Sequence, residues 1–219
     1  MAVLAAGCAA LFVPASGSAD VVLNGGFETL DGGFPGGVQN WYASSSGTGS
    51  ASGYSTLAAM VHTGVNGWLL EPHSLGNNDI GTASVGADHW VITGGGEYDL
   101  SFSLRFLGGT AAGIWGSYTV GYYDNAHTYL SDSGAQFFSY PSEWTEVNQS
   151  FTAPANAGYI NVTFYGFAQD NTGTGEKFGQ WALDDVSMNP AAIPEPGTLA
   201  LLLGGFGLLA GARRFRKRS

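Results

Sequence analysis

The chain of 219 residues has a formal net charge of −10, and its charges are unevenly distributed. Residues 20–190 keep sixteen of the seventeen acidic residues but only two of the seven basic ones, Arg105 and Lys177, so this part has a formal charge of −14. A surface of that sign repels nucleic acid and anionic lipid, which argues against both as partners of the central part. About 170 residues are enough for one buried core, and they include no cysteine, hence no disulfide.

The first nineteen residues have the composition of a secretory signal peptide. The stretch from Ala2 to Ala15 is small and apolar, and Gly17, Ser18 and Ala19 supply the small residues that a signal peptidase requires before its cleavage site. No Lys or Arg precedes the apolar run, so the usual basic n-region is missing. We expect residues 1–19 to be removed on export and residues 20–190 to form the mature domain.

The central part has the pattern of β-structure throughout. From Glu97 to Leu107, apolar and polar residues alternate, and from Tyr159 to Phe167 they alternate again, with Asn161 and Tyr165 on the polar face. Further strands are predicted at 38–43, 57–62, 67–71, 88–92, 113–123, 135–140, 144–152 and 180–188. The low-complexity stretch Ser44–Gly53 is predicted to be a long loop. Many short strands without a helical period predict an all-β fold, a single β-sandwich.

Three short motifs mark the start, the later part and the end of this domain. They are Asn24-Gly25-Gly26-Phe27-Glu28, Trp144-Thr145-Glu146-Val147 followed by Phe151-Thr152-Ala153, and Trp181-Ala182-Leu183-Asp184-Asp185-Val186. This series resembles the jelly-roll carbohydrate-binding modules of the galactose-binding-like superfamily. The resemblance covers residues 21–188 and implies a jelly-roll sandwich with a glycan-binding role.

The same resemblance implies a structural calcium ion at one end of the sandwich. In the resembled modules the opening motif and the closing aspartate meet around the ion. Carried over, Glu28 and Asp184 would supply carboxylates and Gly26 a backbone carbonyl, and calcium takes six to eight such oxygens. The alternative is that these carboxylates only end strands in solvent.

Sugar binding would require exposed aromatic rings beside planar polar side chains. Six residues are candidates: Trp68, Trp90, Trp115, Arg105, Asn161 and Tyr165. If the strands 97–107 and 159–167 belong to one sheet, Arg105 would share a face with Asn161 and Tyr165. The alternative for each ring is a place in the core, because burying large rings is what a sandwich does with them.

The sequence gives little support to catalysis. The four histidines show no H-E-x-x-H spacing, and no G-x-S-x-G motif occurs. Two carboxylate pairs are conceivable, Glu143 with Glu146 and Asp184 with Asp185. Strand residues one or three positions apart point to opposite faces, so neither pair is expected to face one substrate. A pair assembled from distant strands stays open.

The C-terminal segment 191–219 has three parts in order. Pro194, Glu195 and Pro196 form an extended, accessible stretch. Residues 198–212 form an uncharged Leu/Gly-rich run that just reaches membrane-spanning length when its flanks are included. Residues 213–218 carry five basic side chains, which hold that end on the cytoplasmic side.

This order resembles the PEP-CTERM sorting signal of exported bacterial proteins. The family implies recognition by an exosortase, a membrane protease-transferase, with removal of the tail. It also implies an inner-membrane-anchored precursor that is later delivered to the cell surface or the exopolysaccharide matrix. A plain C-terminal anchor is the alternative.

Together these features predict a non-enzymatic, exported surface or matrix protein whose sandwich binds glycan weakly. A purely structural or adhesive matrix component and an extracellular glycan-active enzyme are the two alternatives. An exposed aromatic face would favour the first hypothesis, and a cleft with two carboxylates would favour the enzyme.

Overall fold

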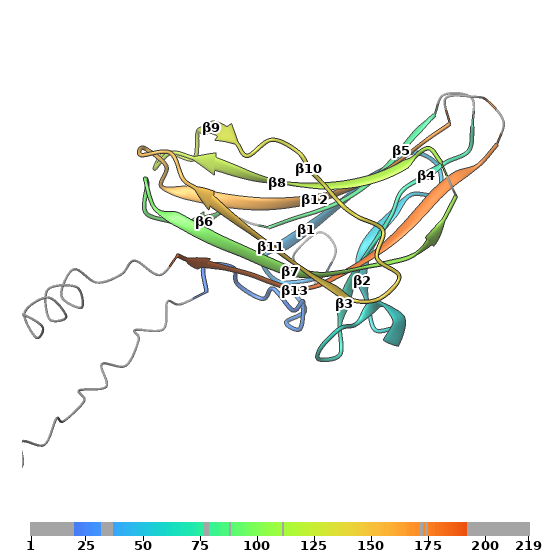
Figure 1. Cartoon of the computed structure of the whole chain (residues 1–219), viewed down its shortest axis with the longest axis horizontal. Coiled ribbons are helices and arrows are strands. Elements are labelled where there is room, and N and C mark those ends of the chain that lie inside the picture. The colour runs from blue at the N-terminus through green and yellow to red at the C-terminus, as the bar shows by residue number, and fades with distance from the viewer. Residues whose placement is uncertain are drawn as a thin grey trace, which may run out of the picture.

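The computed structural model describes residues 20–31, 37–76, 79–87, 89–110, 112–170, 173 and 175–191. The predicted signal peptide and the tail from residue 192, with its predicted helix 198–212, lie outside these residues. Within the described part, no helix is long and apolar enough to cross a membrane. Two antiparallel sheets pack face to face, so the predicted all-β sandwich is confirmed (Figure 1).

The first sheet, here sheet 1, has seven strands. In spatial order they are β1 (Trp41–Ser46), β5 (Ile80–Ala87), β12 (Tyr159–Gln169), β8 (Ile114–Tyr123) and β10 (Gln136–Phe137). Two short strands lie off this path: β6 (Trp90–Val91) pairs with β12, and β9 (Tyr129–Asp132) pairs with β8.

The second sheet, sheet 2, has six strands. In spatial order they are β11 (Thr145–Thr152), β7 (Glu97–Gly109), β13 (Lys177–Pro190), β3 (Gly67–Glu71) and β2 (Ala51–Ser55), while β4 (His73–Ser74) pairs with β13. A single turn of 3-10 helix, η1 (Ala58–Met60), precedes β3. Because β7 and β12 lie in different sheets, the expectation that Arg105 shares a face with Asn161 and Tyr165 is wrong.

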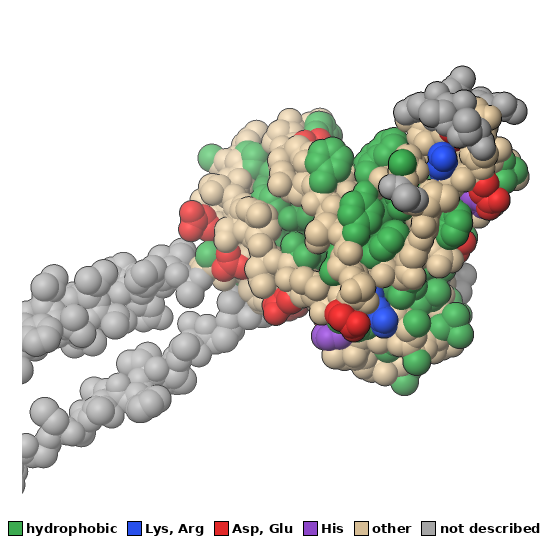
Figure 2. Space-filling view, turned by 45° about the vertical axis from the view of Figure 1, so that its right-hand side comes forward, with side chains coloured by type: hydrophobic (Ala, Val, Ile, Leu, Met, Phe, Trp, Pro, Cys, Tyr) green, Lys and Arg blue, Asp and Glu red, His purple; other side chains and the backbone are tan. Residues whose placement is uncertain are grey.

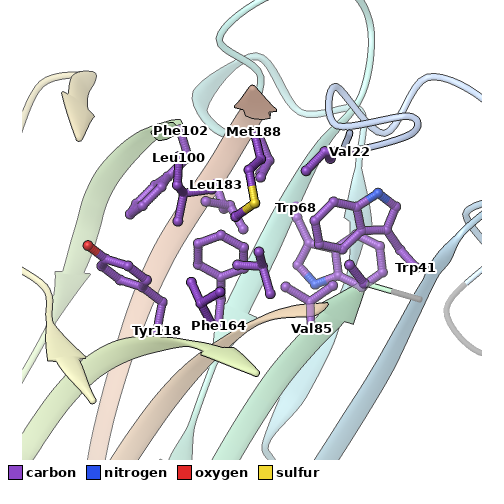
Figure 3. Close-up of a cluster of buried hydrophobic side chains, with 14 of the residues drawn as sticks. Val22, Trp41, Trp68, Val85, Leu100, Phe102, Tyr118, Phe164, Leu183 and Met188 are labelled. Carbon is purple, nitrogen blue, oxygen red and sulfur yellow. The ribbon is translucent and has the colours of Figure 1, made fainter. Parts of the chain in front are cut away.

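The core fills the space between the two sheets. Alternate residues of β7 and β12 point inward, as their period of two predicts, and they meet aromatic rings from β1 and β3. Figure 3 shows ten of these side chains: Val22, Trp41, Trp68, Val85, Leu100, Phe102, Tyr118, Phe164, Leu183 and Met188. Ring contacts such as Phe102 against Phe164, with centroids 5.0 Å apart, join the sheets.

The first described segment lies beside the last strand. Val21 donates its N–H to the Met188 carbonyl (2.7 Å), and Val186 donates to the Gly25 carbonyl (3.0 Å). The approach requires a glycine, since a Cβ on Gly25 would lie 1.6 Å from the Val186 oxygen. The two ends of the domain therefore meet, as the resemblance implied.

Some sequence predictions of single elements are wrong. Residues 57–62 form η1 and its flanks instead of a strand. The stretch predicted to be a loop, Ser44–Gly53, contains the end of β1 and the start of β2. The central strand β5 was not predicted, because it consists mostly of glycine, alanine, serine and threonine, and glycine and alanine are depleted in strands.

Candidate functional site

The outer face of sheet 1 carries a stack of aromatic rings. Trp115 on β8 stands opposite Phe167 on β12, and their rings stack with centroids 5.3 Å apart and planes 13° apart. Tyr165, two positions along β12, continues the stack at 5.9 Å and 22° from Phe167. All three rings are half-buried. They point away from the core, which the alternate residues of β8 and β12 supply. Together they form a continuous row of partly exposed apolar rings.

A row of polar groups crosses the same sheet beside this stack. Tyr42 on β1 lies over Gly86 of β5, where a Cβ would meet its ring at 2.7 Å. The Asn161 side chain lies over Gly121, and its Nδ2 donates to the Tyr123 hydroxyl (3.3 Å). Burial raises the pKa of Tyr42, while hydrogen bonds to Asn161 and Thr163 oppose the shift. Planar polar groups thus lie next to stacked rings.

We call this surface the aromatic face and define it by Tyr42, Trp115, Tyr123, Asn161, Tyr165 and Phe167. Beyond it, His127 stacks on Tyr159 at the start of β12, with ring centroids 3.9 Å apart. From Asn161 to Phe167 the strand spans about 20 Å. The surface is therefore long enough for several sugar rings in a row.

The structure separates the predicted sugar-binding residues into three places. Trp115, Asn161 and Tyr165 lie on the aromatic face. Trp68 and Trp90 have exposed fractions of 0% and 5% and belong to the core, so the binding role predicted for them is wrong. Arg105 lies on the outer side of β7, in the other sheet, where its Nε donates to the Ser142 carbonyl (3.0 Å).

Sequence reasoning missed Tyr42 and Phe167, and it left Tyr123 among several rings that were not assigned to the core. Phe167 continues the alternation of β12 by one further step beyond Tyr165, so the pattern contained a usable signal. Tyr42 reaches the aromatic face only because β1 pairs with β5. Because β5 itself was not predicted, the sequence could not indicate that β1 pairs with it.

The three predicted calcium ligands are neighbours in the structure. A Cβ on Gly26 would lie 3.8 Å from Glu28 Cγ and 4.0 Å from Asp184 Oδ1. Both carboxylates, however, already accept backbone hydrogen bonds from residues 62–66, the loop before β3. Glu28 Oε1 accepts from Val65 (2.8 Å) and Asn66 (3.0 Å).

Asp184 is engaged in the same way. Its Oδ2 accepts the N–H groups of His62 (2.8 Å) and Thr63 (3.0 Å), and its Oδ1 accepts that of Asp185 (2.8 Å). Within the described ranges, no group of three His, Cys, Asp or Glu side chains could hold a metal ion. Calcium takes six to eight oxygens, so a complete site would need ligands beyond the three predicted residues. The calcium prediction stays a prediction.

A β-bulge brings the two closing aspartates to one loop. The register of β13 against β7 shifts between Asp184 and Ser187, and Asp185 adopts a positive φ of 51°. Asp185 Oδ2 lies 2.5 Å from His62 Nδ1, and Thr63 Oγ1 donates to Asp185 Oδ1. The expectation that Asp184 and Asp185 serve opposite faces is therefore wrong, because the bulge breaks the strict alternation.

The buried Asp184 predicts a specific pH dependence of stability. Burial raises its pKa to about 6, so between about pH 4 and pH 6 the folded state binds a proton more tightly than the unfolded one. The free energy of unfolding of the wild type, compared with that of Asp184→Asn, should fall as the pH rises from about 4 to 7. Urea unfolding of both proteins in chelator at several pH values measures this difference.

Asp132→Asn is the control for that series. A hydrogen bond from the Tyr129 hydroxyl lowers the pKa of Asp132. The contribution of Asp132 to the free energy of unfolding therefore changes only below about pH 4. The difference between wild type and Asp132→Asn should stay flat from about pH 4 to 7. If the difference between wild type and Asp184→Asn is equally flat, or grows with pH, Asp184 does not have a raised pKa in the folded state.

Melting in calcium tests the metal prediction. A site filled to ten times its dissociation constant adds about 1.4 kcal/mol to stability, a shift of roughly 3–6 °C for a domain of this size. If calcium binds, the wild type melts higher in millimolar calcium than in chelator, and the double variant Glu28→Gln, Asp184→Asn does not. If the wild type melts at the same temperature in both buffers, calcium does not bind, and the two carboxylates only hold the loop 62–66.

Comparisons with known proteins agree with the predictions for the C-terminal tail and for the fold of the central domain. Residues 192–217 match the family model of the PEP-CTERM protein-sorting motif. No curated protein matches the sequence.

Solved structures show the fold of the central domain. TmCBM61 in complex with β-1,4-galactotriose has 14% identity and a TM-score of 0.51, over 79% of this chain and 99% of that one. The enzymatically active domain of tailspike protein 4 of bacteriophage CBA120 has 14% identity and a TM-score of 0.55, over 78% of this chain. The match covers only 21% of the tailspike chain. At such identities the likeness concerns the fold alone. The chain thus ends in a PEP-CTERM sorting motif, and its central domain has the β-sandwich fold found in carbohydrate-binding modules.

Proposed function

We propose that the protein is exported to the cell surface or the extracellular matrix, where its sandwich binds polysaccharide without cleaving it. The sorting motif supports the destination. The aromatic face supports the binding, and its stacked Trp115, Phe167 and Tyr165 are the single observation that carries the proposal.

Stacked rings suit a sugar for a physical reason. The faces of a pyranose ring carry C–H groups, which pack on flat aromatic surfaces, while its edges carry hydroxyls. The hydroxyls need donors and acceptors at the side of the rings. The Tyr42 and Tyr123 hydroxyls supply both, and the buried Asn161 amide is hydrogen-bonded to them. Because the stack follows β12, a linear chain lying along that strand would meet the most rings.

The charge of the domain supports a neutral or cationic glycan. Only Arg105 and Lys177 are basic in residues 20–190, against sixteen acidic residues. On the face drawn in Figure 2, acidic side chains are accordingly more frequent than basic ones. An anionic polysaccharide would be repelled by this surface.

The support for a non-catalytic role comes from the carboxylates. Glycosidases use two carboxylates that face one bond. The aromatic face itself contains none. On sheet 2, a cleft is lined by two carboxylates, Glu146 and Asp185, the feature that would favour the enzyme. Asp185 already uses both oxygens in contacts with His62 and Thr63, which supports the non-catalytic role.

Replacing the tryptophan at one end of the stack tests glycan binding. Trp115→Ala should weaken binding to a neutral β-linked polysaccharide about tenfold, corresponding to about 1.4 kcal/mol. Affinity electrophoresis against a panel of soluble polysaccharides measures the change. Tyr54→Ala is the matched control, because Tyr54 is an exposed ring of β2 in the other sheet. Equal retardation of wild type and Trp115→Ala on every polysaccharide would contradict the role of the aromatic face.

The tail proposal concerns processing by an exosortase-type enzyme. Replacing Pro194, Glu195 and Pro196 with three alanines should leave a precursor that is retained in the membrane, since the signal for cleavage is gone. Fractionation followed by intact-mass measurement of released protein decides the point. If released wild-type protein still ends at Ser219, the tail is not cleaved, and only the interpretation as a plain C-terminal anchor is left.

A further inference from the structure

A second candidate site lies on the outer side of sheet 2, away from the aromatic face. A cavity of about 390 Å³ opens there, lined by His62, Ser101, Phe102, Ser103, Trp144, Glu146 and Asp185. Ser101 and Ser103 alternate along β7 with the core residues Leu100, Phe102 and Leu104, so the cavity is on the side of the sheet opposite the core. Its volume is at the lower end of the range for small-molecule sites.

Two rings form one wall of the cavity. Trp144, just before β11, is half-buried, and its ring centroid lies 5.1 Å from that of His62. His62 is held in place by its contacts with Asp185 Oδ2 (2.5 Å) and Ser103 Oγ (3.1 Å). Both contacts use the same atom, His62 Nδ1, so these three residues are not arranged as a Ser-His-Asp catalytic triad, in which the two ring nitrogens serve different partners.

The contact with Asp185 fixes the tautomer of His62. An ionised carboxylate only accepts, so Nδ1 carries the proton of this contact. Glu146 stands opposite Ser103 in the pairing of β11 with β7, and its side chain is exposed. Among the described residues, no hydrogen bond or ion pair engages the Glu146 carboxylate. The groups around the cavity are thus mainly acceptors.

No basic side chain is among the described residues that line the cavity. Arg105, two positions beyond Ser103 on β7, is the nearest basic residue along that strand, and its Nε donates to the Ser142 carbonyl. Glu146 and Asp185 therefore place two acidic groups beside an aromatic ring. Acceptors, negative charge and a tryptophan together favour a ligand that carries a positive charge and several donors.

We propose that this cavity binds a sugar unit with a free amine, a hexosamine without its acetyl group. The protonated amine donates to Glu146 and lies within the field of the Trp144 ring, while the sugar hydroxyls exchange hydrogen bonds with His62 and the two serines. The site differs from the aromatic face in location and in the chemistry it selects, and it does not rest on the function proposed above.

The experiment compares two oligosaccharides that differ only in the amine. The full chain in mild detergent is titrated by calorimetry with β-1,4-linked glucosamine oligomers and with the same oligomers fully N-acetylated. At about pH 6, below the pKa of an amine, the free-amine oligomer should bind about tenfold more tightly or better. Glu146→Gln should remove most of that preference, and Trp144→Ala should weaken binding of the free-amine oligomer about tenfold.

Glu143→Gln is the matched control. Glu143 is exposed, lies three residues before Glu146 and does not line the cavity, so its replacement changes the net charge by the same amount. If attraction to the acidic domain as a whole held the oligomer, both variants would lose affinity equally, and the proposal would be overturned. Equal affinity of the wild type for the two oligomers would overturn it as well.

A fourth variant, Trp115→Ala, separates this site from the aromatic face. Trp115→Ala leaves the cavity intact, so the preference for the free amine should persist in it. Loss of that preference in Trp115→Ala, with Glu146→Gln unaffected, would place the amine-binding site on sheet 1 and overturn the assignment. Melting curves of all four variants confirm that each is folded.

Discussion

The loop from His62 to Asn66 is held by two carboxylates, and much of the domain depends on this arrangement. Asp184, fully buried on the last strand, accepts the N–H groups of His62 and Thr63, and Glu28, in the first segment, accepts those of Val65 and Asn66. Gly64, between these pairs, has a φ of 68°, and a Cβ there would lie 2.0 Å from Glu28 Oε1. A buried carboxylate without hydrogen-bond donors would destabilise the fold. Because the loop supplies these donors, the first segment, the loop and the last strand depend on one another.

The two outer faces differ because their strands have different neighbours. In sheet 1, the glycines of β5 and β8 leave room for Tyr42 and Asn161 to lie flat against the backbone, which turns the outer face into a surface of rings and amides. In sheet 2, the held loop covers part of β13 instead. The bulge at Asp185 directs a second carboxylate to the same loop, which places His62 against Trp144. One face is therefore open and flat, and the other contains a cavity.

The sequence predicted what depends on local periodicity and missed what depends on pairing. Alternation located β7 and β12 and put Asn161 and Tyr165 on an outer face, because side chains of a strand alternate wherever it lies. Trp68 was misplaced because Gly67-Trp68-Leu69-Leu70 does not alternate, and only its pairing with Leu183 and Tyr54 decides which side is buried. The bulge at Asp185 and the contact of Tyr42 with Gly86 are products of register, for which a single sequence carries no signal.

The position of the two candidate sites limits what one molecule can hold. Stacked sheets lie about 10 Å apart, and the outer faces point in opposite directions. A glycan stretched along β12 on sheet 1 cannot also enter the cavity beside β7 and β11, because the whole sandwich lies between them. Ligands on the two faces therefore belong to separate chains or to distant parts of one chain. With both sites filled, the domain would connect glycan segments, and the acidic surface would keep neighbouring copies apart by repulsion.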